Sequence, residues 1–234
     1  MRKVIAANWK MNKTVKEAVD FVTQLSKYTF KSDVVLCVPF TYLESVSKKN
    51  KFLTGAQNMF YEEKGAFTGE ISPLMLKSLK VDYVLLGHSE RRTLFYEDNE
   101  LINKKVKAAL KHGLKVILCV GENLDERSEG MEFEVVSQQL KECLVGIKSF
   151  KNIVIAYEPV WAIGTGKNAQ LRDIEEMHAF IREQLKKPVR ILYGGSVKPD
   201  NARDILSQKD VDGALVGSAS LDVKSFVKIV KAAE

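Results

Sequence analysis

Short apolar runs alternate with longer amphipathic stretches along the whole chain. Several of these runs are continuous in Val, Ile and Leu, which is typical of parallel strands buried on both faces. They cover Val4–Ala7, Val34–Val38, Phe52–Ala56, Tyr83–Leu86, Val116–Val120, Ile153–Tyr157, Val189–Tyr193 and Val211–Val216. The pattern therefore predicts eight strands.

The stretches between these runs have the period of a helix. Thr14 and Glu17 have the spacing of a capping box, and Gly113 stands where the cap of a helix over residues 98–112 is expected. The apolar stripes are Val15, Ala18, Val19 and Val22; Leu101, Ile102, Val106, Ala109 and Leu110; Ile174, Met177, Ile181 and Leu185; and Val223, Phe226, Val227 and Val230. We expect these helix faces to cover a sheet.

The repeat length selects the fold. Eight strands in 234 residues leave about 29 residues for each strand and helix, which suits a compact (β/α)8 barrel. No linker or shift in composition divides the chain, so we predict the α/β class and a single-domain (β/α)8 TIM barrel, with one catalytic domain over residues 1–234. A doubly wound sheet is the alternative, but the glycine-rich fingerprint usual after its first strand is absent from Asn8-Trp9-Lys10.

Composition narrows the expected partners and location. Lys and Arg number 36 against 30 Asp and Glu, a formal charge of +6 that is dispersed among acidic neighbours, so we expect no nucleic-acid partner. No apolar run approaches the roughly 20 residues that cross a bilayer, and the N-terminus lacks the apolar core of a signal peptide, so we expect no membrane partner.

Cys37, Cys119 and Cys143 have no CxxC spacing and are expected as buried thiols of a cytoplasmic protein. The three histidines are too scattered in sequence to predict a metal site.

The ends of the predicted strands carry candidate chemistry, because they share one rim of a barrel. Glu158 ends a strongly apolar run, and an apolar surrounding makes a carboxylate a stronger base. The segment Pro159–Gly166 that follows is apolar and closed by glycines, which is typical of a lid. A base beneath a lid that excludes water is suited to removing a proton from carbon. The alternative for Glu158 is a capping or salt-bridge residue.

Two other strand ends offer groups that stabilise negative charge. His88 opens a polar segment that enters a helical turn, where the helix dipole disfavours imidazolium and keeps the ring neutral. A neutral ring can donate a hydrogen bond to a carbonyl oxygen that becomes an enediolate. Asn8 and Lys10 lie on one face of the first strand, which places an amide and a cation beside one developing oxyanion. A structural histidine and a surface lysine are the alternatives.

Glycines and serines gather after the last three strands. They are Gly164, then Gly194-Gly195-Ser196, then Gly217-Ser218. Barrels often hold phosphate with the loops after strands seven and eight, and although tight turns would explain each glycine singly, their clustering favours a phosphate site. Neither GxGxxG nor GxxxxGK[ST] occurs, so a nucleotide is not indicated.

The chain resembles the triosephosphate isomerase family over nearly its whole length. Independent motifs carry this resemblance, and they follow one another in the order typical of the family. They are Asn8-Trp9-Lys10-Met11-Asn12, Gly55-Ala56-Gln57-Asn58, Gly65-Ala66-Phe67-Thr68-Gly69-Glu70, Gly87-His88-Ser89-Glu90-Arg91-Arg92, Cys119-Val120-Gly121-Glu122, the stretch from Ala156 to Gly166, and Tyr193-Gly194-Gly195-Ser196-Val197.

The resemblance implies an aldose–ketose isomerase of glycolysis and gluconeogenesis that interconverts dihydroxyacetone phosphate and D-glyceraldehyde 3-phosphate without cofactor or metal. It implies that Glu158 shuttles the proton and that His88 is the neutral electrophile. Lys10 and Asn8 would bind the substrate and stabilise the enediolate, and Glu90 matches the acidic neighbour of the catalytic lysine. The amides implied for the phosphate are those of Gly164, Ser196, Gly217 and Ser218.

The resemblance also implies a homodimer, in which the loop Phe60–Ser72 reaches the partner's site near Met11 and Asn12. Two alternatives of other classes stay open. One is another phosphosugar barrel enzyme, such as an epimerase or decarboxylase, with metal ligands or a lysine–aspartate arrangement at the strand ends. The other is a non-catalytic barrel that binds phosphate or nucleic acid.

The chain departs from the family pattern at three places. Ser218 stands where the family usually has a second glycine, and Tyr96 stands where a glycine is common. The stretch between the predicted lid and the seventh strand is shorter than usual. These departures concern local loop geometry, because a side chain is unfavourable wherever the backbone needs a positive φ.

Overall fold

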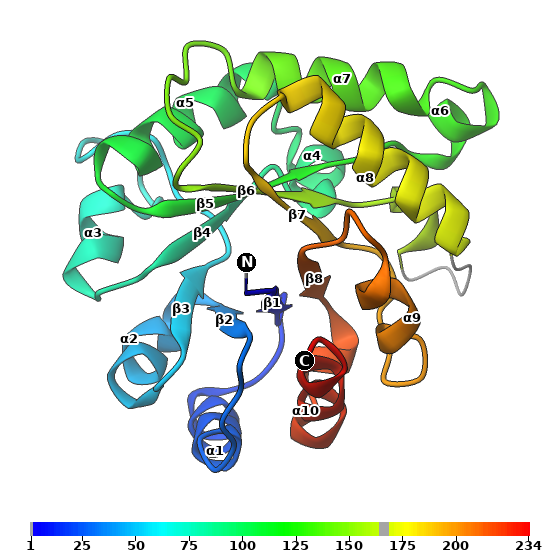
Figure 1. The fold of residues 1–234 in the computed structure, drawn as a ribbon. Helices are drawn as coiled ribbons and strands as arrows, with labels where there is room; N and C mark the ends of the chain where they lie inside the picture. The colour runs from blue at the N-terminus through cyan, green and yellow to red at the C-terminus, as the bar shows by residue number, and fades with distance from the viewer. Residues whose placement is uncertain (1, 164–168) are drawn as a thin grey trace.

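The computed structural model describes residues 2–163 and 169–234, whose strands close into a barrel (Figure 1). Neighbouring strands are parallel throughout, and β8 pairs with β1 to close the ring. The strands are β1 (Val4–Asn8), β2 (Asp33–Val38), β3 (Leu53–Ala56), β4 (Tyr83–Leu86), β5 (Lys115–Val120), β6 (Ile153–Tyr157), β7 (Arg190–Tyr193) and β8 (Gly213–Val216). The predicted strands and the predicted (β/α)8 barrel are confirmed, and the closed ring excludes the doubly wound alternative.

Helices surround the barrel in chain order (Figure 1). They are α1 (Val15–Leu25), α2 (Phe40–Lys49), α3 (Pro73–Ser78), α4 (Ser89–Phe95), α5 (Asn99–Lys111), α6 (Leu124–Ser128), α7 (Glu132–Cys143), α8 (Leu171–Leu185), α9 (Ala202–Ser207) and α10 (Val223–Ala232). Two short 3-10 turns, η1 (Val160–Ala162) and η2 (Ser218–Ser220), follow β6 and β8. Both turns lie after strand ends, on the side of the predicted site.

Side chains of each strand alternate between two cores. In β1, Ile5 and Ala7 pack toward the helices, whereas Val4 and Ala6 belong to the separate core inside the barrel. The other interior members are Val35, Cys37, Tyr83, Leu85, Ile117, Cys119, Val154, Ala156, Leu192 and Leu215. Because both faces are buried, the strands read as continuous apolar runs.

Helix α1 begins as predicted, but it buries only part of the predicted apolar stripe. The Thr14 side chain accepts the N–H of Glu17, whose carboxylate accepts the N–H of Thr14, so the predicted capping box is confirmed. The buried residues are Ala18, Phe21, Val22 and Leu25. Val15, predicted to face the sheet, is 47% exposed. Phe21 is the larger anchor, because its ring packs edge-on against Trp9 with a centroid distance of 4.9 Å.

A glycine permits the seam at which the barrel closes. A Cβ added to Gly213 at the start of β8 would lie 1.9 Å from the carbonyl oxygen of Val4 in β1. Any side chain here would push the two strands apart, so the register between the first and last strands depends on this residue.

Cys37, Cys119 and Cys143 are buried and unbridged, as predicted. Burial raises the pKa of the Cys37 thiol to about 12. In the described part of the chain, no helix combines the length and the apolar character that a membrane span requires.

Candidate active site

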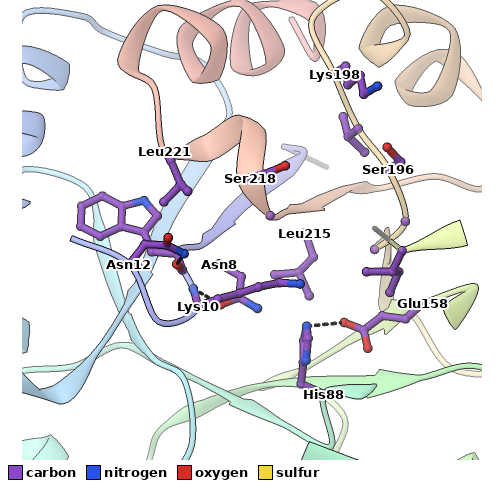
Figure 2. A pocket seen from close by; sticks show the side chains of 16 residues that line it. Asn8, Lys10, Asn12, His88, Glu158, Ser196, Lys198, Leu215, Ser218 and Leu221 are labelled. Atoms are coloured by element: carbon purple, nitrogen blue, oxygen red, sulfur yellow. Dashed lines mark hydrogen bonds and ion pairs between the residues drawn. The ribbon is translucent and has the colours of Figure 1, made fainter. Parts of the chain in front are cut away.

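A cavity of about 310 Å³ lies at the C-terminal ends of the strands (Figure 2). Most of the residues predicted for the site line it, from five different strand ends: Asn8, Lys10, His88, Glu158, Ser196, Gly217 and Ser218. Glu90 lines an adjoining hollow that shares Asn8, Lys10 and His88. Gly164, the remaining predicted residue, lies outside the described residues. The cavity is of a size that suits a small molecule.

Glu158 is held at the end of β6 by its neighbours on both sides. The N–H of Glu158 donates to the carbonyl oxygen of Val120 at 2.8 Å. On the other side, the N–H of Gly194 donates to the carbonyl oxygen of Tyr157 at 2.7 Å. A Cβ on Gly194 would lie 2.8 Å from Glu158 Cγ. The glycine at this position therefore leaves room for the stem of the carboxylate.

The Glu158 carboxylate is buried, with 2% of the side chain exposed. Its Oε2 accepts the backbone N–H of Ser89 at 2.9 Å. Its Oε1 accepts no hydrogen bond within the described residues, although His88 Nε2 lies 3.1 Å away (Figure 2). One oxygen is thus fixed, and the other remains available to a proton.

His88 caps helix α4, and this fixes the tautomer of its ring. The Nδ1 atom accepts the backbone N–H of Glu90 at 3.2 Å, so Nδ1 carries no proton. The proton of the neutral ring then resides on Nε2, the nitrogen that faces the cavity and Glu158. The prediction that His88 stands at a helix start is confirmed, and the ring presents an N–H donor to the cavity.

Lys10 is held in an uncommon backbone conformation by polar contacts on both sides. Its φ is +50°, a region that a residue with a side chain seldom occupies and that costs on the order of 1 kcal/mol or more. Its N–H donates to Asn8 Oδ1 at 3.0 Å, and its carbonyl oxygen accepts a hydrogen bond from Gln57 Nε2 at 3.0 Å. Gln57 also donates to the carbonyl oxygen of Cys37 at 3.1 Å, which ties Lys10 to β2.

The Lys10 ammonium extends into the cavity, toward the side where His88 and Glu158 lie (Figure 2). It forms an ion pair with Glu90, with 2.6 Å between Nζ and Oε1. Glu90 therefore both donates a backbone N–H to the His88 ring and holds the lysine head.

Unused backbone donors line the opposite end of the cavity. Within the described residues, the N–H groups of Ser196, Gly217 and Ser218 donate to no acceptor. Asn201 shapes the turn that carries Ser196, since its Oδ1 accepts the N–H of Lys198 at 2.7 Å and its Nδ2 donates to the carbonyl oxygen of Ser196 at 3.1 Å. Free amides in a preformed turn are suited to an anion such as phosphate.

The Ser218 departure leaves the backbone unstrained. Ser218 opens η2 and is absent from the residues with positive φ, so its side chain is tolerated there. Tyr96 differs, since it ends α4 with φ +56° and ψ +33°, the left-handed conformation in which glycine is favoured.

The start of the predicted lid is anchored on Glu122, in the segment that follows β5. The Trp161 Nε1–H donates to Glu122 Oε1 at 2.7 Å, and the Tyr157 hydroxyl donates to the same oxygen at 3.1 Å. Burial raises the pKa of the Glu122 carboxyl. The Arg127 guanidinium lies over the Trp161 ring, 5.4 Å from its centroid. The predicted lid Pro159–Gly166 is described only as far as Ile163, which lines the cavity.

Sequence reasoning missed three contributors to this geometry. Ser89 fixes Glu158 through a backbone N–H, which no side-chain pattern reveals. Gln57 was named only within a motif of the family resemblance, and Asn201 was not recognised at all. Asn201 follows Pro199-Asp200 directly before α9, so its position in a turn was a signal that could have been used.

Chemically, the cavity combines a buried carboxylate, an imidazole N–H and an ammonium at one end with free amides at the other. The first set can move a proton while stabilising charge on oxygen, and the second can hold an anion. In the part of the chain that the structure describes, no group of three or more His, Cys, Asp or Glu residues is placed to hold a metal ion.

Comparison with known proteins agrees with this geometry. Residues 3–233 match the model of the family described as triosephosphate isomerase. The chain is 52% identical to the protein named triosephosphate isomerase of Finegoldia magna (strain ATCC 29328 / DSM 20472 / WAL 2508), over 98% of both chains. It is 51% identical to proteins of the same name from Alkaliphilus metalliredigens (strain QYMF), over 98% of this chain and 99% of that one, and from Caldanaerobacter subterraneus subsp. tengcongensis (strain DSM 15242 / JCM 11007 / NBRC 100824 / MB4), over 98% of both.

Proposed function

The chain belongs to the triosephosphate isomerase family, and from this premise we propose how its cavity interconverts dihydroxyacetone phosphate and D-glyceraldehyde 3-phosphate. The reaction is the isomerisation of glycolysis. Its chemistry requires a proton to leave one carbon and arrive at the next, through an enediolate. The observation that carries the assignment of roles is the convergence of the Glu158 carboxylate, the His88 Nε2–H and the Lys10 ammonium on one cavity.

Glu158 is the base of this proposal. It removes a proton from C1 of dihydroxyacetone phosphate and returns a proton to C2, while His88 Nε2 gives a proton to O2 and takes the hydroxyl proton of O1, which gives D-glyceraldehyde 3-phosphate. Burial favours this role because it keeps water away from the carboxylate that carries the proton between the two carbons. The bond from Ser89 orients the group without occupying Oε1.

His88, Lys10 and Asn8 stabilise the enediolate in this proposal. The His88 Nε2–H donates a hydrogen bond to the oxygen that gains negative charge as the proton leaves carbon. A neutral donor is available there because Nδ1 is engaged by the helix backbone. The Lys10 ammonium and the Asn8 amide add positive potential at the same end, and Glu90 holds the lysine head in reach.

The amides of Ser196, Gly217 and Ser218 bind the phosphate in this proposal. They lie beyond the reacting end of the cavity. Within the described residues these N–H groups have no acceptor, so no hydrogen bond of the protein has to break before they bind the phosphate. Gly164 is proposed as a further donor from the family resemblance alone. Holding the phosphate fixes both reacting carbons relative to Glu158. Binding thereby lowers the entropic part of the activation barrier, because the reacting groups are already in position.

We further propose that residues 1–234 form one catalytic domain, that the protein also acts in gluconeogenesis, and that it is a cytoplasmic homodimer. The family resemblance supports these assignments. The dimer has additional support, because the exposed Met11 and Phe95 line the hollow that adjoins the active site.

A coupled assay tests the proposed function. D-glyceraldehyde 3-phosphate is supplied with glycerol 3-phosphate dehydrogenase, NADH and a chelator, and we expect NADH oxidation that depends on the chain and is unchanged by the chelator. No oxidation would instead indicate a non-catalytic phosphate-binding barrel. Activity that the chelator removes would indicate a metal-dependent phosphosugar enzyme.

A further inference from the structure

The backbone of Lys198 is held by hydrogen bonds, close in sequence to the Ser196 amide that is assigned to the phosphate. It follows Ser196 in the segment after β7, and its N–H donates to Asn201 Oδ1 at 2.7 Å. Its carbonyl oxygen accepts the N–H groups of Asn201 and Ala202 at 3.2 and 3.0 Å. The backbone of Lys198 is therefore fixed by three hydrogen bonds in the turn that precedes α9.

The side chain of Lys198 is free by contrast. It is among the residues that line the cavity, and it belongs to the same chain segment as Ser196 (Figure 2). Within the described residues its ammonium has neither an ion pair nor a hydrogen bond. The head group is thus available to a ligand without first losing a protein partner.

The charges around the cavity show what such a cation adds. Among the described residues that line it, the charged side chains are those of Lys10, Glu158 and Lys198. Lys10 is already paired with Glu90 at 2.6 Å, and Glu158 is an anion at the reacting end. Without Lys198 the lining has no unpaired positive charge, whereas a phosphate monoester carries a charge of about −1.5 to −2 at pH 7.

We propose that Lys198 is a second cation of the substrate site, which recognises the dianionic phosphate of the triose phosphate alongside the backbone amides. This proposal rests on the proposed function. The amides supply directional hydrogen bonds, and Lys198 supplies the net charge that attracts the dianion into the cavity and holds it there. Lys198 acts on binding and leaves the proton transfer to Glu158.

The test compares Lys198→Met with the wild type, because methionine keeps an unbranched stem and removes the charge. At low ionic strength we expect KM for D-glyceraldehyde 3-phosphate to rise about tenfold, with a much smaller change in kcat. The effect is expected to shrink at about 0.5 M salt, where the Debye length falls to a few ångströms. Lys198→Arg is expected to restore most of the affinity, and Lys209→Met, at an exposed site before β8, to match the wild type.

A phosphate-free substrate separates recognition of the anion from damage to the site. Lys198→Met is expected to convert D-glyceraldehyde as efficiently as the wild type, since that substrate has no phosphate. An equal loss on both substrates would overturn the proposal, and so would an unchanged KM for the phosphorylated substrate at low salt.

Calorimetric titration with inorganic phosphate keeps this test independent of the reaction. Weaker phosphate binding by Lys198→Met supports the role of Lys198 even if the wild type shows no isomerase activity, in which case the proposed function alone fails. Equal phosphate affinity in the two proteins would overturn the role of Lys198 and leave the proposed function standing.

Discussion

Single residues at the active site are held in place by hydrogen bonds in which a backbone group is one of the two partners. Lys10 remains at φ +50° because Asn8 and Gln57 bind the two sides of its peptide. The Glu158 carboxylate is oriented by the N–H of Ser89, and the His88 ring by the N–H of Glu90. Glu158 and His88 are therefore oriented by backbone N–H groups, whereas the backbone of Lys10 is held by two side chains.

The first prediction at this scale concerns the tautomer of His88. Because Nδ1 accepts the N–H of Glu90, we expect the neutral ring to carry its proton on Nε2. ¹⁵N NMR of histidine-labelled protein distinguishes the two nitrogens, and His88→Gln identifies the signal by its loss. A proton on Nδ1 in the resting enzyme would contradict both the cap and the proposed donor.

Sequence alone indicated which side chains gather at the strand ends, but not how they are held. Asn8, Lys10, His88 and Glu158 were found because strand ends of a barrel meet at one rim. The positive φ of Lys10 and the bond from Ser89 leave no trace in residue type or spacing. Lys198 was overlooked because lysine is the usual residue of a solvated surface.

The end of helix α4 shows how an element tolerates an unfavourable residue. Tyr96 ends the helix at φ +56° with 87% of its surface exposed, so it pays conformational strain and buries little. We expect Tyr96→Gly to raise the free energy of unfolding by about 1 kcal/mol, measured by chemical denaturation.

Ser218→Gly is the matched control for this prediction. Ser218 has a negative φ, so glycine relieves no strain there and we expect stability to be unchanged or slightly lower. Substrate affinity is expected to change little. Stabilisation by Ser218→Gly, or destabilisation by Tyr96→Gly, would contradict the backbone conformations described above.

Helix α8 makes the barrel sensitive to acid through His178. This fully buried ring lies between Tyr157 and Tyr193, and its Nδ1–H donates to the carbonyl oxygen of Asp210 at 3.1 Å. Burial lowers the pKa of His178 to about 4, and its Nε2 has no partner within the described residues. Protonation would therefore place an unpaired charge in the core.

The direction of the resulting pH dependence follows from that lowered pKa. Between about pH 6.5 and 4 the unfolded chain binds a proton that the folded chain does not, so stability is lost as the pH falls through this window. The loss from this group is on the order of 3 kcal/mol. His178→Asn retains a donor for Asp210, and we expect it to flatten the fall in stability between pH 6.5 and 4. Parallel curves for the two proteins would contradict this account.

At the scale of single elements, the apolar period predicted the position of a helix in the sequence better than it predicted the buried face of that helix. The strands were found almost to the residue, since burial on both faces makes them continuous apolar runs. The predicted stripe of α1 included Ala18 and Val22, which are buried, but it placed Val15 on the buried face and left out Phe21, whose ring packs against Trp9. Short elements such as α3 and η2 depend on caps and tertiary contacts and have too few residues for a period.

Over the whole molecule, exposed apolar side chains concentrate after the first four strands. They include Met11 at 96% exposure, Phe40, Phe67, Leu74, Met75, Leu94 and Phe95. Three of them, Met11, Phe40 and Phe95, line the hollow that adjoins the active site. A surface of this kind is typical of an interface between proteins, which supports the proposed homodimer.

The proposed dimer predicts the mass of the protein in solution and the change in that mass when the interface is disrupted. The wild type is expected to sediment with twice the mass of one chain, and Met11→Lys to dissociate it, because the charge would be buried without a partner. Val145→Lys is the matched control, since Val145 is 59% exposed in the loop after α7 and is expected to leave the mass unchanged. A wild type that remains monomeric at micromolar concentration, or dimers in both variants, would contradict the proposed interface.

The central claim is that Glu158 carries a proton between two carbons of a triose phosphate, and isomerisation in D₂O tests it most directly. Starting from D-glyceraldehyde 3-phosphate, the proton taken from C2 exchanges on the carboxyl group, so the account predicts dihydroxyacetone phosphate with deuterium at C1, measured by ¹H NMR. Glu158→Gln is expected to form this product roughly 10² to 10⁴ times more slowly or worse, whereas the exposed Glu183→Gln keeps the wild-type rate. Product without deuterium at any extent of conversion, or wild-type labelling by Glu158→Gln, would contradict the account.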